Sequence, residues 1–258
     1  YYENGDTFRD YVSQKRWGLL PSVGLTLGDR TRLTYDFEWT RVEVPFDRGI
    51  VVLNGDFDTV PRSRFLGEPG DRDTVARATG HQLRLEHDLN DDWSLLVGAS
   101  HRDTLLTGFS SDAETVASRQ MLYVDGHSLS RQRRSRRYDA EHSVLRAELS
   151  GQFETGALRH RILIGGDFDQ FEYDNYFTRF RPPAVSSVPS NEAGYVIDID
   201  NPVYGQYPLP DTTVITNRLD TQRSFGFYVQ DQIELTDRLQ IRIGGRYDNL
   251  RLETDNRL

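Results

Sequence analysis

The chain has 258 residues and a formal net charge of −9, and 36% of its residues are hydrophobic. No run approaches the ~18 consecutive apolar residues that a membrane-spanning helix needs. Cysteine is absent, which excludes disulfides and thiolate metal sites, and the acidic balance argues against a general nucleic-acid-binding protein.

Four short turn sequences divide the chain, and each lies between two strand-like runs. In chain order they are Gly28-Asp29-Arg30, Asn90-Asp91-Asp92, Glu154-Thr155-Gly156 and Thr236-Asp237-Arg238. Glycine, asparagine and aspartate tolerate the backbone angles that tight hairpins need. The sequence therefore predicts about eight antiparallel strands in four hairpins.

The strand-like runs alternate between apolar and polar residues. The clearest apolar row, in the run before the last turn, is Phe225, Phe227, Val229, Ile233 and Leu235. Period-two alternation places such a row on one face of a strand and the polar residues on the other. The polar face carries too much charge for a protein core, so the pattern predicts lipid on one side and water on the other.

The lengths of the runs and of their connections support the same interpretation. A tilted strand crosses a bilayer with ~9–11 residues, whereas the runs at 222–235 and 239–254 are longer. The connections at 44–73, 107–135 and 178–221 are long and contain most of the prolines. Short turns that alternate with long loops are typical of outer-membrane barrels, in which the turns are periplasmic and the loops extracellular. The alternative is a soluble β-sandwich, whose strands are usually ~5–6 residues long.

Three stretches, in this order, resemble segments of TonB-dependent siderophore receptors. They are residues 44–49 with 61–69, residues 158–167, and residues 227–233 with 244–248. The resemblance extends over nearly the whole chain and is greatest to receptors of the ferric-hydroxamate and ferric-pyoverdine type.

The resemblance implies an all-β fold, namely an antiparallel transmembrane segment of the ~22-stranded barrel of this family. Residues 1–258 are then expected to be a partial barrel domain that lacks the plug domain and the C-terminus of the barrel. The implied function is import of ferric siderophores across the Gram-negative outer membrane, energised by TonB through the missing plug. Implied partners are the siderophore, TonB and outer-membrane lipid, with no nucleic acid.

No cofactor and no enzymatic activity are expected. Iron would arrive already wrapped in its siderophore, and the sequence contains no phosphate-binding loop or nucleophile elbow. The acidic pairs Asp56/Asp58, Asp167/Asp169 and Asp198/Asp200 lack the remaining ligands of a calcium loop. The six histidines show no zinc-type spacing.

Aromatic residues near the long loops are the candidate ligand contacts, because aromatics supply a broad contact area with little entropy to lose. These candidates are Tyr176, Phe177, Phe180, Tyr195, Tyr204 and Tyr207. The alternative is that they pack the loops together or belong to the interfacial girdle. Trp39, on the apolar face, is expected to be a girdle residue.

The arginine run at 131–137 has two interpretations. It could meet lipopolysaccharide phosphates or attract an anionic ligand, or it could be a solvated loop. Other classes also stay open for the whole chain: a passive porin, an adhesive outer-membrane barrel, or a soluble carbohydrate-binding β-protein.

Overall fold

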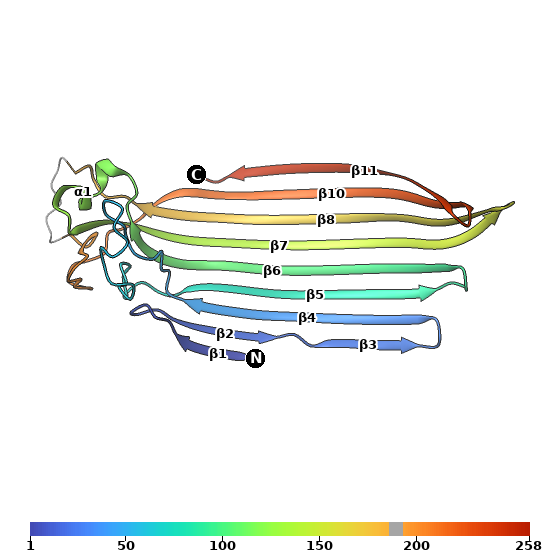
Figure 1. Ribbon diagram of the computed structural model, residues 1–258, viewed down its shortest axis with the longest axis horizontal. Helices are drawn as coiled ribbons and strands as arrows, with labels where there is room; N and C mark the ends of the chain where they lie inside the picture. Colours follow the sequence, from blue (N-terminus) through green and yellow to red (C-terminus); the bar gives the residue numbers. More distant parts are fainter. Residues whose placement is uncertain (186–192) are drawn as a thin grey trace.

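The structure, a computed structural model, describes residues 1–185 and 193–258, which form one large antiparallel sheet (Figure 1). The strands are β1 (Tyr2–Asp6), β2 (Ser13–Leu19), β3 (Ser22–Leu27), β4 (Thr31–Val44), β5 (Thr74–Asp88), β6 (Trp93–Ala113), β7 (Ser128–Thr155), β8 (Leu158–Phe180), β9 (Val196–Asp198), β10 (Thr213–Thr236) and β11 (Leu239–Asn256). Two single-turn helices, η1 (Ala117–Arg119) and α1 (Leu122–Asp125), lie between β6 and β7. None of the helices among the described residues is long and apolar enough to cross a membrane.

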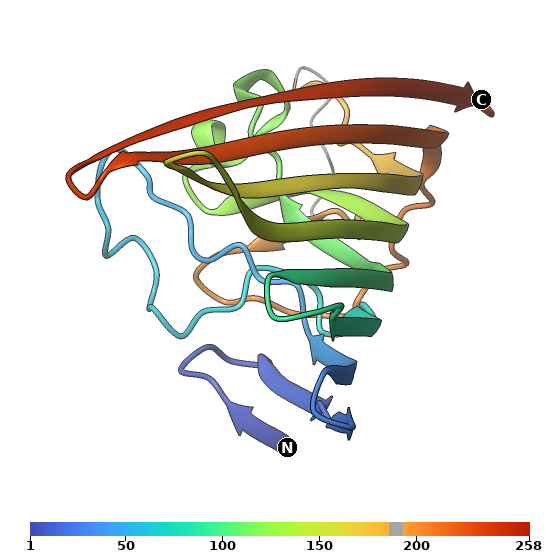
Figure 2. The ribbon, with the colours of Figure 1, turned by 90° about the vertical axis from the view of Figure 1, so that its right-hand side faces the viewer.

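Nine strands are neighbours in the order β1-β2-β4-β5-β6-β7-β8-β10-β11, while β3 pairs with β4 and β9 pairs with β7. The four predicted turns are confirmed, and they connect β3 to β4, β5 to β6, β7 to β8 and β10 to β11. All four turns lie at one end of the sheet and the long loops lie at the other (Figure 1). Within the described chain, β1 and β11 each pair on one side only, and Figure 2 shows them at opposite ends of a curved, unclosed layer.

The first predicted strand differs from the expectation in two ways. Its two parts, β2 and β3, both pair with β4, but the pairing is interrupted at Leu20 and Pro21. Proline has no amide hydrogen for the ladder, although its carbonyl accepts a hydrogen bond from the Phe37 amide at 3.0 Å. The additional strand β1 pairs with β2; its short sequence has no apolar alternation from which it could be predicted.

The strand register aligns apolar residues of neighbouring strands in rows on one face of the sheet. Directly opposed residues share a face, and one such row runs across seven strands through Leu33, Leu85, Val97, Ala147, Gly166, Phe227 and Tyr247. We call the face that carries this row the outward face and the opposite one the inward face. On the outward face, Phe225 and Phe227 are 53% and 47% exposed. The apolar rows therefore do not form the core of a globule.

Buried apolar side chains gather instead among the loops. The described cluster consists of Val60, Leu66, Leu122, Leu129, Ile197 and Ile199. Its members come from three loop regions and from the loop-side end of β7. We call the packed residues 45–73, 114–127, 181–185 and 193–212 the loop cap. The loop cap is the part of the described chain that resembles an ordinary protein interior.

Candidate functional site

The inward face is lined with paired charges along the middle of the strands. Arg246 of β11 donates hydrogen bonds to both carboxylate oxygens of Asp167 on β8, each at 2.8 Å. Arg102 of β6 makes the same two-pronged contact with Glu38 of β4, at 2.8 and 3.1 Å. Ion pairs at this density are costly to bury but are ordinary in water. The inward face is thus suited to a wet lumen.

The loop cap is fastened to β7 by an almost fully buried ion pair. Arg131 and Glu68 have side chains that are each 4% exposed, with Nη2 and Oε2 3.2 Å apart. The same guanidinium donates to the carbonyl oxygens of Gly67 and Gly194. Burial lowers the pKa of Arg131, and Glu68 opposes this shift. One side chain therefore joins two loop regions, 45–73 and 193–212, to the sheet.

The arginine run belongs to a strand, so the prediction of a solvated loop is wrong. β6 continues to Ala113 and β7 begins at Ser128, which leaves a connection much shorter than the expected 107–135. Arg133 contacts Asp71 at 3.3 Å, and Arg137 contacts Asp139 at 3.1 Å. Arg131, Arg133 and Arg134 are paired with carboxylates from other parts of the chain, namely Glu68, Asp71 and Asp112. Binding of lipopolysaccharide by this run stays a prediction.

Among the predicted ligand contacts, Tyr204 is engaged within the loop cap. Its hydroxyl donates a hydrogen bond to the carbonyl oxygen of Phe65, and its ring meets Tyr11 edge-on at 5.2 Å between centroids. Burial, which is the largest cause, raises the pKa of Tyr204 to about 12. Tyr195 packs against Phe180 at 5.4 Å. These contacts are those of the alternative in which the aromatics hold the loops together.

The other three predicted contacts lie in different surroundings. Tyr207 lines a pocket of about 240 Å³ together with Glu68, Arg131 and Asp198. Phe177 is on the inward face, whereas the register places Tyr176 on the outward face opposite Arg137. The structure therefore does not gather the six aromatics into one site, and their contact with a ligand stays a prediction.

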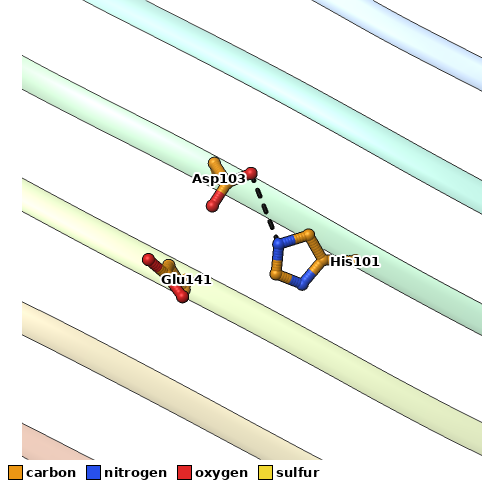
Figure 3. Close-up of side chains that lie close together, drawn as sticks. All are labelled: His101, Asp103 and Glu141. Atoms are coloured by element: carbon orange, nitrogen blue, oxygen red, sulfur yellow. Dashed lines mark ion pairs between the residues drawn. The ribbon is translucent and has the colours of Figure 1, made fainter.

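One group of side chains could hold a divalent cation. The donor atoms of His101, Asp103 and Glu141 lie within 4.8 Å of one another (Figure 3), and Ser143 Oγ lies 2.8 Å from Nδ1 of His101. Sequence spacing missed the trio because Glu141 comes from the neighbouring strand, directly opposite Asp103. The trio is on the outward face, and its side chains are partly or fully exposed, so it lies off any path through the lumen.

The acidic pairs that suggested calcium have other roles. The Asp56 and Asp198 carboxylates each accept a hydrogen bond from the amide two residues later, at 2.9 and 2.8 Å, which closes a loop turn. In the strand pair, Asp167 binds Arg246 and Asp169 contacts His142. These carboxylates are occupied by turn amides, an arginine and a histidine.

Comparison with known proteins identifies relatives over almost the whole chain. A family model described as "TonB dependent receptor-like, beta-barrel" matches residues 16–258. The chain is 32% identical over 249 residues to the metal-pseudopaline receptor CntO of Pseudomonas aeruginosa. It is 27% identical over 260 residues to the ferrioxamine B receptor of Salmonella typhimurium. Each alignment covers 96% of this chain and 33% of the relative, so the chain spans about a third of these curated relatives.

Solved structures share the fold. The siderophore receptor PiuA of Acinetobacter baumannii superposes with a TM-score of 0.76 at 19% identity, covering 96% of this chain and 37% of that one. The closed form of the ferric-catecholate import receptor Fiu of E. coli K12 gives a TM-score of 0.77 at 20% identity, covering 99% and 37%. The arrangement of strands and loops is thus that of a contiguous piece of a larger barrel.

Proposed function

The chain belongs to the TonB-dependent receptor β-barrel family, and from this premise we propose that it is a barrel segment of a receptor that imports metal-loaded siderophores. Membership places the chain in the outer membrane of Gram-negative bacteria. The import activity is our proposal for the whole protein, of which this chain is a part.

The observation that carries the proposal is the division of the sheet into two faces. Apolar rows run outward across seven strands, and paired charges run inward on the same strands. A barrel built in this way presents hydrocarbon to lipid and encloses a hydrophilic passage. The loop cap lies at the end of that passage opposite the short turns, where a large solute would first meet the protein.

The protein's role in this proposal is to bind and move a solute, without covalent catalysis. The metal reaches the receptor already chelated, so it is cargo, and no resident cofactor is required. Loop-cap and upper inward residues make the first contacts, and TonB supplies the energy through a plug domain. Family membership favours this energised import over the passive porin, the adhesive barrel and the soluble carbohydrate-binding protein.

A second candidate cargo is a chelate of a metal other than iron. The relative at 32% identity is a metal-pseudopaline receptor, whereas the relative at 27% identity is a ferrioxamine B receptor. The ferric-hydroxamate or ferric-pyoverdine subclass expected from sequence stays a prediction beside this alternative.

The test is uptake by a strain that lacks the complete gene. Under metal starvation, wild-type and deletion cells receive radiolabelled iron, zinc or nickel bound to individual siderophores. We expect the deletion to abolish uptake of at least one chelate, and we expect deletion of tonB to abolish the same uptake. Unchanged uptake of every chelate would refute the proposal, and uptake that persists without TonB would indicate a passive pore.

A further inference from the structure

Four arginine side chains converge on the inward face where the strands meet the loop cap. Arg134 of β7 and Arg179 of β8 are directly opposed across the ladder. Arg136, two residues further along β7, lies on the same face, and Arg48 approaches from the loop after β4. We call Arg48, Arg134, Arg136 and Arg179 the upper arginine cluster. The pairing of β7 with β6 and β8 has no register shift. The three cluster members on strands therefore lie on the same face as Arg146 and Glu148, which is the inward face.

The cluster carries more positive charge than its protein partners neutralise. Within residues 1–185 and 193–258, the one carboxylate paired with it is Asp112, which lies 3.6 Å from Arg48 and 3.6 Å from Arg134. Neither Arg136 nor Arg179 has a carboxylate within 4.0 Å in the described chain. The sequence as a whole is acidic, with a net charge of −9, and elsewhere on the inward face arginines pair one to one with carboxylates, as Arg102 does with Glu38. The local excess of positive charge is therefore unusual for this chain.

Burial makes the imbalance costly. Arg136 is 7% exposed; its Nη2 donates to Ser110 Oγ at 2.9 Å, but its buried Nη1 has no hydrogen-bond partner. Its guanidinium lies 4.4 Å from the ring centre of Phe46, which Arg48 also approaches, at 5.5 Å. An unpaired buried charge and two like charges opposed across a ladder both destabilise a fold. An anion bound here would remove both penalties.

We propose that the upper arginine cluster binds the anionic groups of the imported chelate, so that the cargo is a metal complex of net negative charge. This inference rests on the import function proposed above and adds the chemical class of the ligand. Guanidinium groups bind carboxylate and similar oxyanions through paired hydrogen bonds. A cationic chelate, such as a tris-hydroxamate with a free ammonium group, is repelled by the same cluster.

The experiment measures binding to the full-length receptor, purified in detergent, by tryptophan fluorescence and by calorimetry. The probes are a triply anionic ferric tris-catecholate, anionic ferric citrate and a cationic ferric tris-hydroxamate. The variants are Arg179→Gln, Arg179→Lys and the double variant Arg134→Gln/Arg179→Gln. The matched control is Arg137→Gln, which removes a 65% exposed arginine from the opposite face of β7, the strand that also carries Arg134. Heat-modifiable electrophoretic mobility establishes that each variant is folded.

We expect an anionic probe to bind, with an affinity that falls as salt rises. Each neutralised arginine should weaken this binding about tenfold, Arg179→Lys should retain most of it, and Arg137→Gln should leave it unchanged. Arg179 is less buried than Arg136. The single variant Arg179→Gln therefore keeps the test valid if the double variant does not fold.

Three results would overturn the inference. If only the cationic probe binds, or if an anionic probe binds equally to wild type and Arg179→Gln, the cluster is not the ligand site, while the import function stands. If Arg137→Gln weakens binding as much as Arg179→Gln, the loss comes from the lower net charge of the receptor and not from a contact between the cluster and the ligand. If no chelate of any charge is bound by the receptor or taken up by cells, the proposed function fails and this inference fails with it.

Discussion

Replacing Arg131 with methionine is expected to loosen the loop cap while the barrel strands stay intact. The substitution removes the contact to Glu68 and the hydrogen bonds to the carbonyls of Gly67 and Gly194. It also leaves the Glu68 carboxylate, 4% exposed, without its cation. Removing one partner of a buried ion pair costs about 3–5 kcal/mol. The loss falls on the loop cap because both loop regions depend on this side chain.

Hydrogen exchange measured by mass spectrometry reports this loss directly. The Ile199 amide donates to the His127 carbonyl at 2.9 Å, and the Arg131 amide donates to the Tyr195 carbonyl at 2.7 Å. The first bond lies inside the loop cap, and the second joins the loop cap to β7. A loss of about 3–5 kcal/mol corresponds to exchange that is faster by roughly two to four orders of magnitude. Peptides from the middle of β8 and β10 should exchange as in the wild type.

Two further variants control this prediction. Glu68→Met combined with Arg131→Met should restore most of the protection, because no uncompensated charge remains. Arg137→Met removes a surface pair and should change stability by less than about 1 kcal/mol. Exchange in Arg131→Met within threefold of the wild type would refute the reasoning. So would a double variant that is as loose as the single one.

Three other predictions concern the loop cap and the lumen. Burial alone would raise the pKa of Glu114, but hydrogen bonds from Arg181 and a backbone amide lower it below the ordinary value of 4.5. The stabilisation that ionised Glu114 provides is therefore fully present above pH 4.5 and is lost as the pH falls through the lowered pKa. In that pH range, proteolysis of the loop cap should accelerate in the wild type. A Glu114→Gln variant with the same pH profile would contradict this. Gly165→Val should lower the unfolding midpoint, with a cost of about 1–3 kcal/mol, because a Cβ atom there would lie 2.4 Å from the Tyr228 ring; an unchanged midpoint would show that the ring moves freely. Tyr204→Phe should cost about 0.5–1.5 kcal/mol of loop-cap protection in hydrogen exchange, and unchanged exchange would mean that the hydroxyl bond to the loop carbonyl is not formed.

Local pattern was sufficient to predict the four hairpins and the faces of their strands, though not β1, β9 or the full length of β6 and β7. The turn at Thr236-Asp237-Arg238 and the alternation from Phe225 to Leu235 depend on residues that are near one another in the chain. Period two and turn chemistry therefore locate them. The interruption at Pro21 follows from the missing amide hydrogen of proline and was within reach of the same reasoning.

The loop cap could not be predicted in this way, because its partners are far apart in the chain. The Tyr204 hydroxyl meets a carbonyl 139 residues away, and Arg131 meets Glu68 across 63 residues. From sequence, a dense arginine run resembles a solvated loop, since its neutralising carboxylates are not visible locally. The opposition of Arg134 and Arg179 requires the register of two strands, which one sequence does not supply.

The central claim is that lipid contacts the outward face and water fills the inward one, and adjacent residues of β10 test it most directly. This chain has no cysteine, so Val229→Cys and Gln230→Cys can each carry a spin label in a full-length receptor freed of other cysteines and placed in liposomes. Collision rates with oxygen, which concentrates in the bilayer, and with a water-soluble nickel chelate are then compared. The account predicts that the label at 229 collides mainly with oxygen and the label at 230 mainly with the nickel chelate. Equal accessibility at the two positions, or the reverse order, would contradict it.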